Sequence, residues 1–167
     1  MCTGNICRSP TAERLARAYA TRHHIPTFSA SSAGTHGVIG HPMHPDAVPV
    51  LRRLGGDPAD FAGRHLTAKI AATADLVLTM TRAHRDRVLE IAPQKLNRTF
   101  TLPEAAALAV HHRAQRLADL AKLRPQLILN ESLDIPDPIG QNPDVFAAVG
   151  QQIADLLPPV LELCRPE

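Results

Sequence analysis

Near the start of the chain stand Cys2-Thr3-Gly4-Asn5-Ile6-Cys7-Arg8-Ser9-Pro10, a stretch that joins a thiol, an arginine and a helix start. Ser9 and Pro10 predict the first helix, because serine is a favourable N-cap and proline suits the first helical position. A short loop directly before a helix directs its backbone N–H groups inward and adds the positive end of the helix dipole. The stretch therefore predicts an anion-binding loop that runs from Cys2 to Arg8.

The residue types in this loop suit transfer of a phosphoryl group to sulfur. A thiolate is the reactive form of cysteine, and we expect Cys2 to be the nucleophile. Arg8 carries a planar fork that can hold two phosphate oxygens, and Ser9 can donate a hydrogen bond to the Cys2 sulfur. Gly4 is expected to let the backbone turn without a Cβ clash, and Asn5 tolerates left-handed geometry. The predicted substrate-binding residues are Thr3, Gly4, Asn5, Ile6, Cys7 and Ser9.

Outward from this loop, apolar periodicity alternates between helix and strand. Strands that alternate with helices predict an α/β fold with a doubly wound parallel sheet, helices on both faces and one domain over residues 1–167. In such sheets ligands bind at the carboxyl ends of strands. The expected strands are 28–33, 76–80 and 98–102. The expected helices are 10–25, 46–54, 67–74, 81–92 and 103–123, the last of these with a break near residues 111–112. A final helix is expected to start at Asn142 and to kink or end at Pro158-Pro159. Residues 124–142 read as a long loop.

Further motifs follow the loop in order: S-S-A-G-T at 31–35, G-R-H-L-T at 63–67, A-D-L-V-L-T-M at 74–80 and D-I-P-D-P at 134–138. Together with residues 2–10 they resemble the low-molecular-weight protein tyrosine phosphatases along nearly the whole chain. The resemblance implies that Cys2 attacks phosphorus in line and forms a phosphocysteine. It also implies that Asp137 first protonates the leaving oxygen and then acts as the base for hydrolysis, and that no metal or cofactor is required.

The resemblance further implies a four-stranded sheet with a buried strand directly before the nucleophile. Only Met1 precedes Cys2 in this sequence. We therefore expect the first strand to be missing or truncated, which would expose the edges of both neighbouring strands.

Several residues leave alternatives open. Ile139-Gly140 stand where the family usually has tyrosine, which weakens the case for a phosphotyrosine substrate. Asp134 is a rival to Asp137 as the acid. Cys7 is either a redox partner of Cys2 or a small buried thiol. A metal site built from His36, His41 and His44 is a further alternative to a simple rim of histidines.

A rival function uses the same chemistry. Arsenate resembles phosphate, and a thiol-dependent arsenate reductase of related fold would use the same loop. A relay through a further cysteine pair is disfavoured, because Cys164 is the one cysteine downstream of the loop. Transfer of the arsenic adduct to a small thiol stays open, as does a non-catalytic phosphate-binding module.

Composition limits the partners. The net charge of +2 is too small to indicate nucleic-acid binding, and no apolar run approaches the length of a membrane span. Three cysteines do not make a disulfide framework, so a reducing, cytoplasmic compartment is expected. The expected partner is a phosphorylated protein, a small phosphomonoester or arsenate, bound by a monomer.

Overall fold

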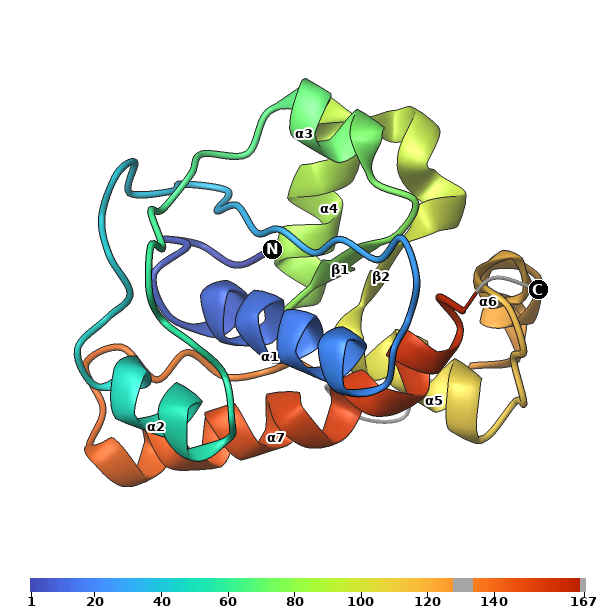
Figure 1. The fold of residues 1–167 in the computed structure, drawn as a ribbon. Coiled ribbons are helices and arrows are strands. Elements are labelled where there is room, and N and C mark those ends of the chain that lie inside the picture. The colour runs from blue at the N-terminus through green and yellow to red at the C-terminus, as the bar shows by residue number, and fades with distance from the viewer. Residues whose placement is uncertain (128–133, 166–167) are drawn as a thin grey trace.

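The computed structural model describes residues 1–127 and 134–165. A short parallel sheet lies in the middle of the molecule, with α4 on one side and α1, α5 and α7 on the other (Figure 1). The elements in chain order are α1 (Arg8–Arg22), α2 (Ala47–Arg53), α3 (Ala68–Thr73), β1 (Val77–Thr79), α4 (Arg82–Ile91), η1 (Pro93–Arg98), β2 (Thr99–Thr101), α5 (Leu102–Val110), α6 (Leu117–Leu123), η2 (Arg124–Gln126) and α7 (Pro143–Glu162).

The two strands form where apolar runs are covered from both faces. β1 pairs in parallel with β2, with Val77 opposite Thr99 and Thr79 opposite Thr101. Phe100 at the centre of β2 is fully buried, as expected for a parallel strand with helices over both faces. Both strands were predicted from the sequence, and both are confirmed in shortened form.

The predicted four-stranded sheet is absent from the described residues, where a two-stranded sheet is found. Residues 28–33 were expected to be a strand, and the prediction is wrong: they carry no strand assignment. The place of the two further strands is taken by single bridges, Cys2 to Gly34 and Gly34 to His65. A strand requires hydrogen bonds to a neighbouring backbone at several successive residues. Cys2 forms only a single bridge, to Gly34, and this is too short to define a strand.

Four helices start at residues whose side chains cap the first turn. Thr67, Thr81, Thr101 and Asn142 each accept a hydrogen bond from a first-turn N–H of the helix that follows. We expected Ser9 to cap α1, but the helix begins at Arg8 with Cys7 as its N-cap residue. The Ser9 hydroxyl therefore lies inside the first turn and is free to reach the loop.

The last helix contradicts one further expectation. α7 continues through Pro158 and Pro159 to Glu162. A proline removes one N–H donor, so the carbonyls four residues earlier, at Ala154 and Asp155, lose their helical partners. Asp155 is exposed to solvent, and Ala154 is partly buried against the core. The side of the helix that includes Val160 packs into the core with α1 and α5, and this packing keeps the helix continuous.

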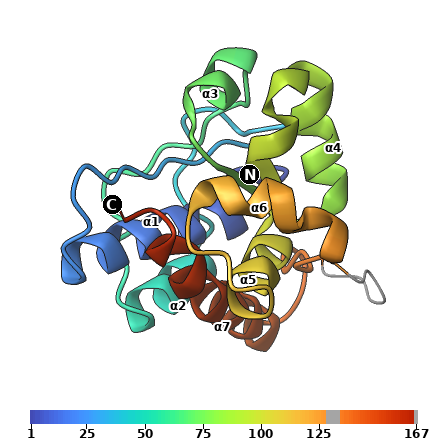
Figure 2. The same ribbon diagram turned by 90° about the vertical axis from the view of Figure 1, so that its right-hand side faces the viewer.

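The predicted break near residues 111–112 is confirmed, because α5 ends at Val110 and α6 begins at Leu117. Figure 2 shows α6 as a separate helix beside α5. The expected loop after Arg124 begins with η2, and its residues 128–133 lie outside the described residues.

No helix among residues 1–127 and 134–165 is both long and apolar enough to cross a membrane.

Candidate active site

The loop from Cys2 to Arg8 turns its carbonyl groups outward. Backbone N–H groups of residues 35–44 hold four of these carbonyls: Thr35 N to Cys2 O at 2.9 Å, His36 N to Thr3 O at 3.0 Å, Val38 N to Gly4 O at 2.9 Å and His44 N to Ile6 O at 2.6 Å. Within the described chain, no acceptor is found for the N–H groups of residues 3–8. Donors fixed in this way are prepared to bind an anion at the N-terminus of α1.

The Cys2 thiol lies within this loop and close to the helix start. Its Sγ atom is 2.9 Å from Ser9 Oγ, and the residue is 3% exposed. The sequence predicted this pairing. Ser9 can stabilise negative charge on the sulfur, and the positive end of the α1 dipole acts in the same direction.

Asn5 holds the loop in place through hydrogen bonds of its side chain. It is fully buried, with a left-handed backbone at φ 57°. Its side-chain amide donates to Ser9 Oγ at 3.0 Å and to Ser32 Oγ at 2.8 Å, and Ser32 donates to Glu13 at 2.7 Å. Arg64 N also donates to Asn5 Oδ1 at 2.8 Å, so this asparagine joins the loop to α1, to Ser32 and to the segment that contains Arg64.

The glycine that the loop requires is Gly34. A Cβ atom at Gly4 would make only ordinary contacts, the nearest at 3.5 Å to Ile6. A Cβ atom at Gly34 would lie 2.2 Å from Thr3 O and 2.9 Å from Asn5 N. The steric role that we assigned to Gly4 is therefore wrong, because the close approach is between two backbone segments that are distant in sequence.

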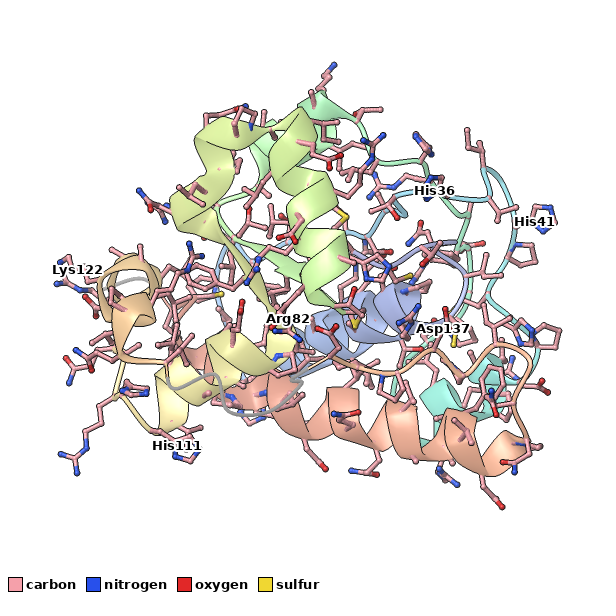
Figure 3. The ribbon with its side chains drawn as sticks, turned by 180° about the vertical axis from the view of Figure 1, so that it is seen from behind. His36, His41, Arg82, His111, Lys122 and Asp137 are labelled. Carbon is pink, nitrogen blue, oxygen red and sulfur yellow. The ribbon has the colours of Figure 1, made fainter. Side chains whose placement is uncertain are left out.

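Arg8 and Asp137 meet at the mouth of the loop. Arg8 Nη2 lies 2.5 Å from Asp137 Oδ2, and Arg8 Nη1 donates to Ile135 O at 3.0 Å. Arg8 is 4% exposed, whereas the Asp137 side chain is 44% exposed. Figure 3 shows Asp137 beside the N-terminal end of α1. The arginine is thus held by the backbone, and the carboxylate is open to a bound substrate.

Asp134 has a different place. Its Oδ1 accepts from Arg82 N at 2.8 Å and lies 3.8 Å from Arg82 Nε. These contacts hold the carboxylate at the N-terminal end of α4, where a negative charge is favourable. Of the two acidic candidates, Asp137 is the one in contact with Arg8.

The remaining predicted loop residues differ in exposure. Thr3 is exposed, Gly4 and Ile6 are partly exposed, and Cys7 is 5% exposed. Burial, followed by the neighbouring Cys2, raises the pKa of the Cys7 thiol to about 12. Cys7 is therefore a neutral thiol at neutral pH. Its oxidation to a disulfide with Cys2 stays a prediction.

The histidines downstream of the loop do not converge. His36 and His41 are exposed on the outer loop (Figure 3), while His44 stacks on Phe146 at a centroid distance of 5.1 Å. No group of three His, Cys, Asp or Glu residues suited to a metal ion occurs in the described part of the chain. The geometry therefore gives no support to the alternative metal site.

Sequence reasoning missed His84. Its Nε2 lies 2.9 Å from Thr3 Oγ1, and its Nδ1 lies 2.7 Å from Thr81 Oγ1. A neutral imidazole has one donor and one acceptor nitrogen, so it can join both hydroxyls and hold the loop to α4. In the sequence, the one indication of a role for His84 was its position three residues after the predicted N-cap Thr81.

The protonation of His84 leads to a first prediction. Burial, followed by the charges of Arg8 and the Met1 ammonium, lowers the pKa of His84 to about 4. In the unfolded chain the same imidazole takes up a proton below about pH 6.5. The unfolded state therefore binds more protons between these values, so His84 stabilises the fold above about pH 6.5, and this contribution is lost as the pH falls toward 4.

Melting temperatures measured at pH 7 and pH 5 should test this. We expect the native chain to lose more stability than a His84→Asn variant over that interval. His111→Asn, which alters an exposed histidine, serves as the matched control and should behave as the native chain does. Equal losses in all three proteins would contradict the assignment.

Comparison with known proteins agrees with this arrangement. The family model described as low molecular weight phosphotyrosine protein phosphatase matches residues 1–112. The chain belongs to this family. Among curated family members, the low molecular weight protein-tyrosine-phosphatase Etp of Escherichia coli is 41% identical over 100 residues. That match covers 60% of this chain and 64% of Etp, slightly less than two thirds of its length.

Solved structures of the family extend the likeness to nearly the whole chain. The low molecular weight protein tyrosine phosphatase from T. tengcongensis superposes with a TM-score of 0.77 at 28% identity, covering 96% of this chain and 94% of its own. The YwlE arginine phosphatase from Geobacillus stearothermophilus has a TM-score of 0.74 at 27% identity, covering 96% and 87%. Both support the α/β fold.

Proposed function

We propose that this protein is a phosphomonoester hydrolase that acts through a phosphocysteine on Cys2, as a protein tyrosine phosphatase of low molecular weight. The observation that carries the proposal is the position of Cys2 in a loop of free N–H groups, with Arg8 bonded to Asp137 at its mouth. Family membership supports the same activity.

In the first step the Cys2 thiolate attacks phosphorus in line. A P–S bond forms as the P–O bond to the leaving group breaks, and Asp137 gives its proton to the departing oxygen. The N–H groups of residues 3–8 and the Arg8 guanidinium stabilise the charge on the transferring group. Arg8 must turn one nitrogen from Asp137 to phosphate, while its bond to Ile135 O keeps the side chain in place.

In the second step water attacks the phosphocysteine. Asp137, now a carboxylate, accepts a proton from that water, and the P–S bond breaks to release inorganic phosphate. The electron pair returns to sulfur, where the Ser9 hydroxyl at 2.9 Å stabilises the regenerated thiolate. Asp137 gives one proton in the first step and takes one back from water in the second, so the protons of the cycle balance.

The substrate class is a phosphorylated protein or a small phosphomonoester. Exposed aliphatic side chains occur next to the loop at Val38 and Ile39 and beyond Asp137 at Ile139. They offer an apolar rim to an aryl group but no aromatic ring on which to stack. We therefore propose phosphotyrosine as the preferred residue, with weaker side-chain selectivity than an aromatic pocket would give.

Turnover of model substrates tests this function. We expect hydrolysis of p-nitrophenyl phosphate and of phosphotyrosine peptides, with much slower hydrolysis of phosphoserine peptides and phosphoarginine. An aryl oxide leaves more readily than the alkoxide of phosphoserine, and the apolar rim disfavours the polar guanidine group of phosphoarginine. The measurement is phosphate release for each substrate. Reduction of arsenate by glutathione serves as the comparison reaction.

The outcomes separate the two functions. Phosphate release without arsenate reduction is expected, because the family model and the relatives named above are phosphatases by name and give no support to a reductase. Arsenate reduction in the absence of phosphomonoester hydrolysis would overturn the proposal.

We further propose that the enzyme is a monomer with one domain over residues 1–167, that it acts in the cytoplasm, and that it binds no nucleic acid.

A further inference from the structure

The three arginines of α4 differ in how closely they are paired. Arg85 and Arg87 each place a terminal nitrogen 2.6 Å from a carboxylate oxygen. The guanidinium of Arg82 has a more distant partner, because its Nε atom lies 3.8 Å from Asp134 Oδ1. Among the described residues, the two terminal nitrogens of Arg82 have no hydrogen-bond acceptor. Arg82 therefore has donors that a second molecule can use.

Arg82 lies at the mouth of the candidate active site. It is the first residue of α4, and its backbone N–H donates to Asp134 Oδ1 at 2.8 Å. The next residue of that segment, Ile135, accepts from Arg8 Nη1 at 3.0 Å. Arg8 and Arg82 are thus held by two consecutive residues. Figure 3 shows Arg82 and Asp137 near the N-terminal end of α4.

A second set of contacts fixes this end of α4 against the anion loop. His84, on the first turn of the helix, lies 2.9 Å from Thr3 Oγ1 and 2.7 Å from Thr81 Oγ1. Thr3 directly follows the nucleophile in the sequence. The backbone of Arg82 therefore has a fixed place beside the loop, while its side chain, 45% exposed, is open to a bound substrate.

The present contact of Arg82 with Asp134 is weak enough to admit another anion. The Asp134 carboxylate already accepts from a backbone N–H at 2.8 Å and lies at the positive end of the α4 dipole, so its charge does not depend on the guanidinium. Exposed ion pairs of this kind contribute little free energy. Asp137 does not compete for Arg82, because its Oδ2 atom bonds to Arg8. An arginine with free terminal nitrogens suits a carboxylate, which it can bind through two parallel hydrogen bonds.

We propose that Arg82 is a specificity-determining residue that binds an aspartate or glutamate side chain of the phosphoprotein, next to the phosphotyrosine. This inference rests on the proposed phosphatase function and adds to it the class of substrate, a phosphotyrosine flanked by acidic residues. Arg82 takes no part in the chemical step. Small aryl phosphates carry no such carboxylate, so their turnover is independent of Arg82.

Two phosphotyrosine peptides of equal length test the proposal. Glutamates flank the phosphotyrosine in one, and glutamines of nearly the same shape replace them in the other. The variant Arg82→Gln removes the charge at the mouth. Arg87→Gln is the matched control, because Arg87 is an exposed arginine of the same helix that is paired with Glu90. The measurements are kcat and KM for both peptides at low and high salt, with p-nitrophenyl phosphate as the reference substrate.

We expect the native enzyme to favour the glutamate peptide by roughly threefold to fivefold in kcat/KM, the scale of an exposed ion pair. The difference should lie mainly in KM and should shrink at high salt, because salt screens exposed charges. Arg82→Gln should abolish the preference and leave the turnover of p-nitrophenyl phosphate unchanged. Arg87→Gln should retain the preference.

Three results would overturn the proposal: equal kcat/KM of the native enzyme for the two peptides, an unchanged preference in Arg82→Gln, or an equal loss of preference in Arg87→Gln. The last would assign the effect to the overall charge of α4. Dissociation constants of both peptides for Cys2→Ser give the same comparison without turnover. Failure of the native enzyme to hydrolyse p-nitrophenyl phosphate would contradict the phosphatase function, whereas these dissociation constants would still decide the role of Arg82.

Discussion

Replacement of Cys2 by serine should reduce the turnover of p-nitrophenyl phosphate by at least about 10⁴-fold, since an alkoxide nucleophile is not available at neutral pH. Binding of phosphate or vanadate should persist, because the N–H groups of residues 3–8 and Arg8 are unchanged. The serine hydroxyl would occupy nearly the same place beside Ser9. Loss of the chemical step with retained binding is thus the expected signature of a covalent mechanism.

The control for this experiment is Cys164→Ser. Cys164 is partly exposed beyond the end of α7, where its Sγ atom contacts Val160 O at 3.7 Å. We expect it to retain native turnover, which would separate the loss of the nucleophile from a general effect of cysteine replacement. Steady-state rates and vanadate inhibition constants provide the readout. Substantial turnover by Cys2→Ser would rule out the phosphocysteine intermediate.

Replacement of Asp137 by asparagine should slow the reaction by roughly 10²–10⁴-fold for leaving groups of high pKa. A carboxamide has no proton to give to the departing oxygen, so the penalty should shrink for leaving groups that depart readily as anions. The structure places Asp137 against Arg8, 44% exposed, at the mouth of the loop. The measurement is the rate across a series of aryl phosphates for the native and variant enzymes.

Asp134→Asn is the matched control. Asp134 lies three residues earlier and bonds to Arg82 N at 2.8 Å, without contact to Arg8. We expect the dependence of its rate on the leaving group to equal that of the native enzyme. A steeper dependence in Asp134→Asn than in Asp137→Asn would show that the acid is wrongly assigned.

Much of the site was predictable because its parts are close together in sequence. Cys2, Arg8 and Ser9 belong to one loop and the helix after it, so local rules for anion loops and helix starts predicted their roles. Thr81 and Asn142 could likewise be identified as N-caps from the residues that follow them. Such local interactions need no knowledge of the tertiary fold.

The parts that escaped prediction are contacts between distant segments. Gly34 is required because Thr3 O passes 2.2 Å from where its Cβ would lie, and His84 contacts Thr3 from α4. The resemblance had implied Asp137 as the acid with Asp134 as its rival, and only the folded chain shows that Asp137 is the carboxylate that meets Arg8. Spacing along the sequence carries no information about these approaches.

The sequence by itself predicted an anion loop before the first helix, two strands that the structure contains, and the family. The loop and the two strands follow from residue type and local periodicity, which act over a few residues, whereas the family follows from the order of its motifs along the chain. Only the tertiary structure decided how much of the sheet forms. Residues 28–33 have the composition of a strand, yet a strand exists only where a neighbouring backbone completes its hydrogen bonds, and in the described chain this segment gains only single bridges at Gly34.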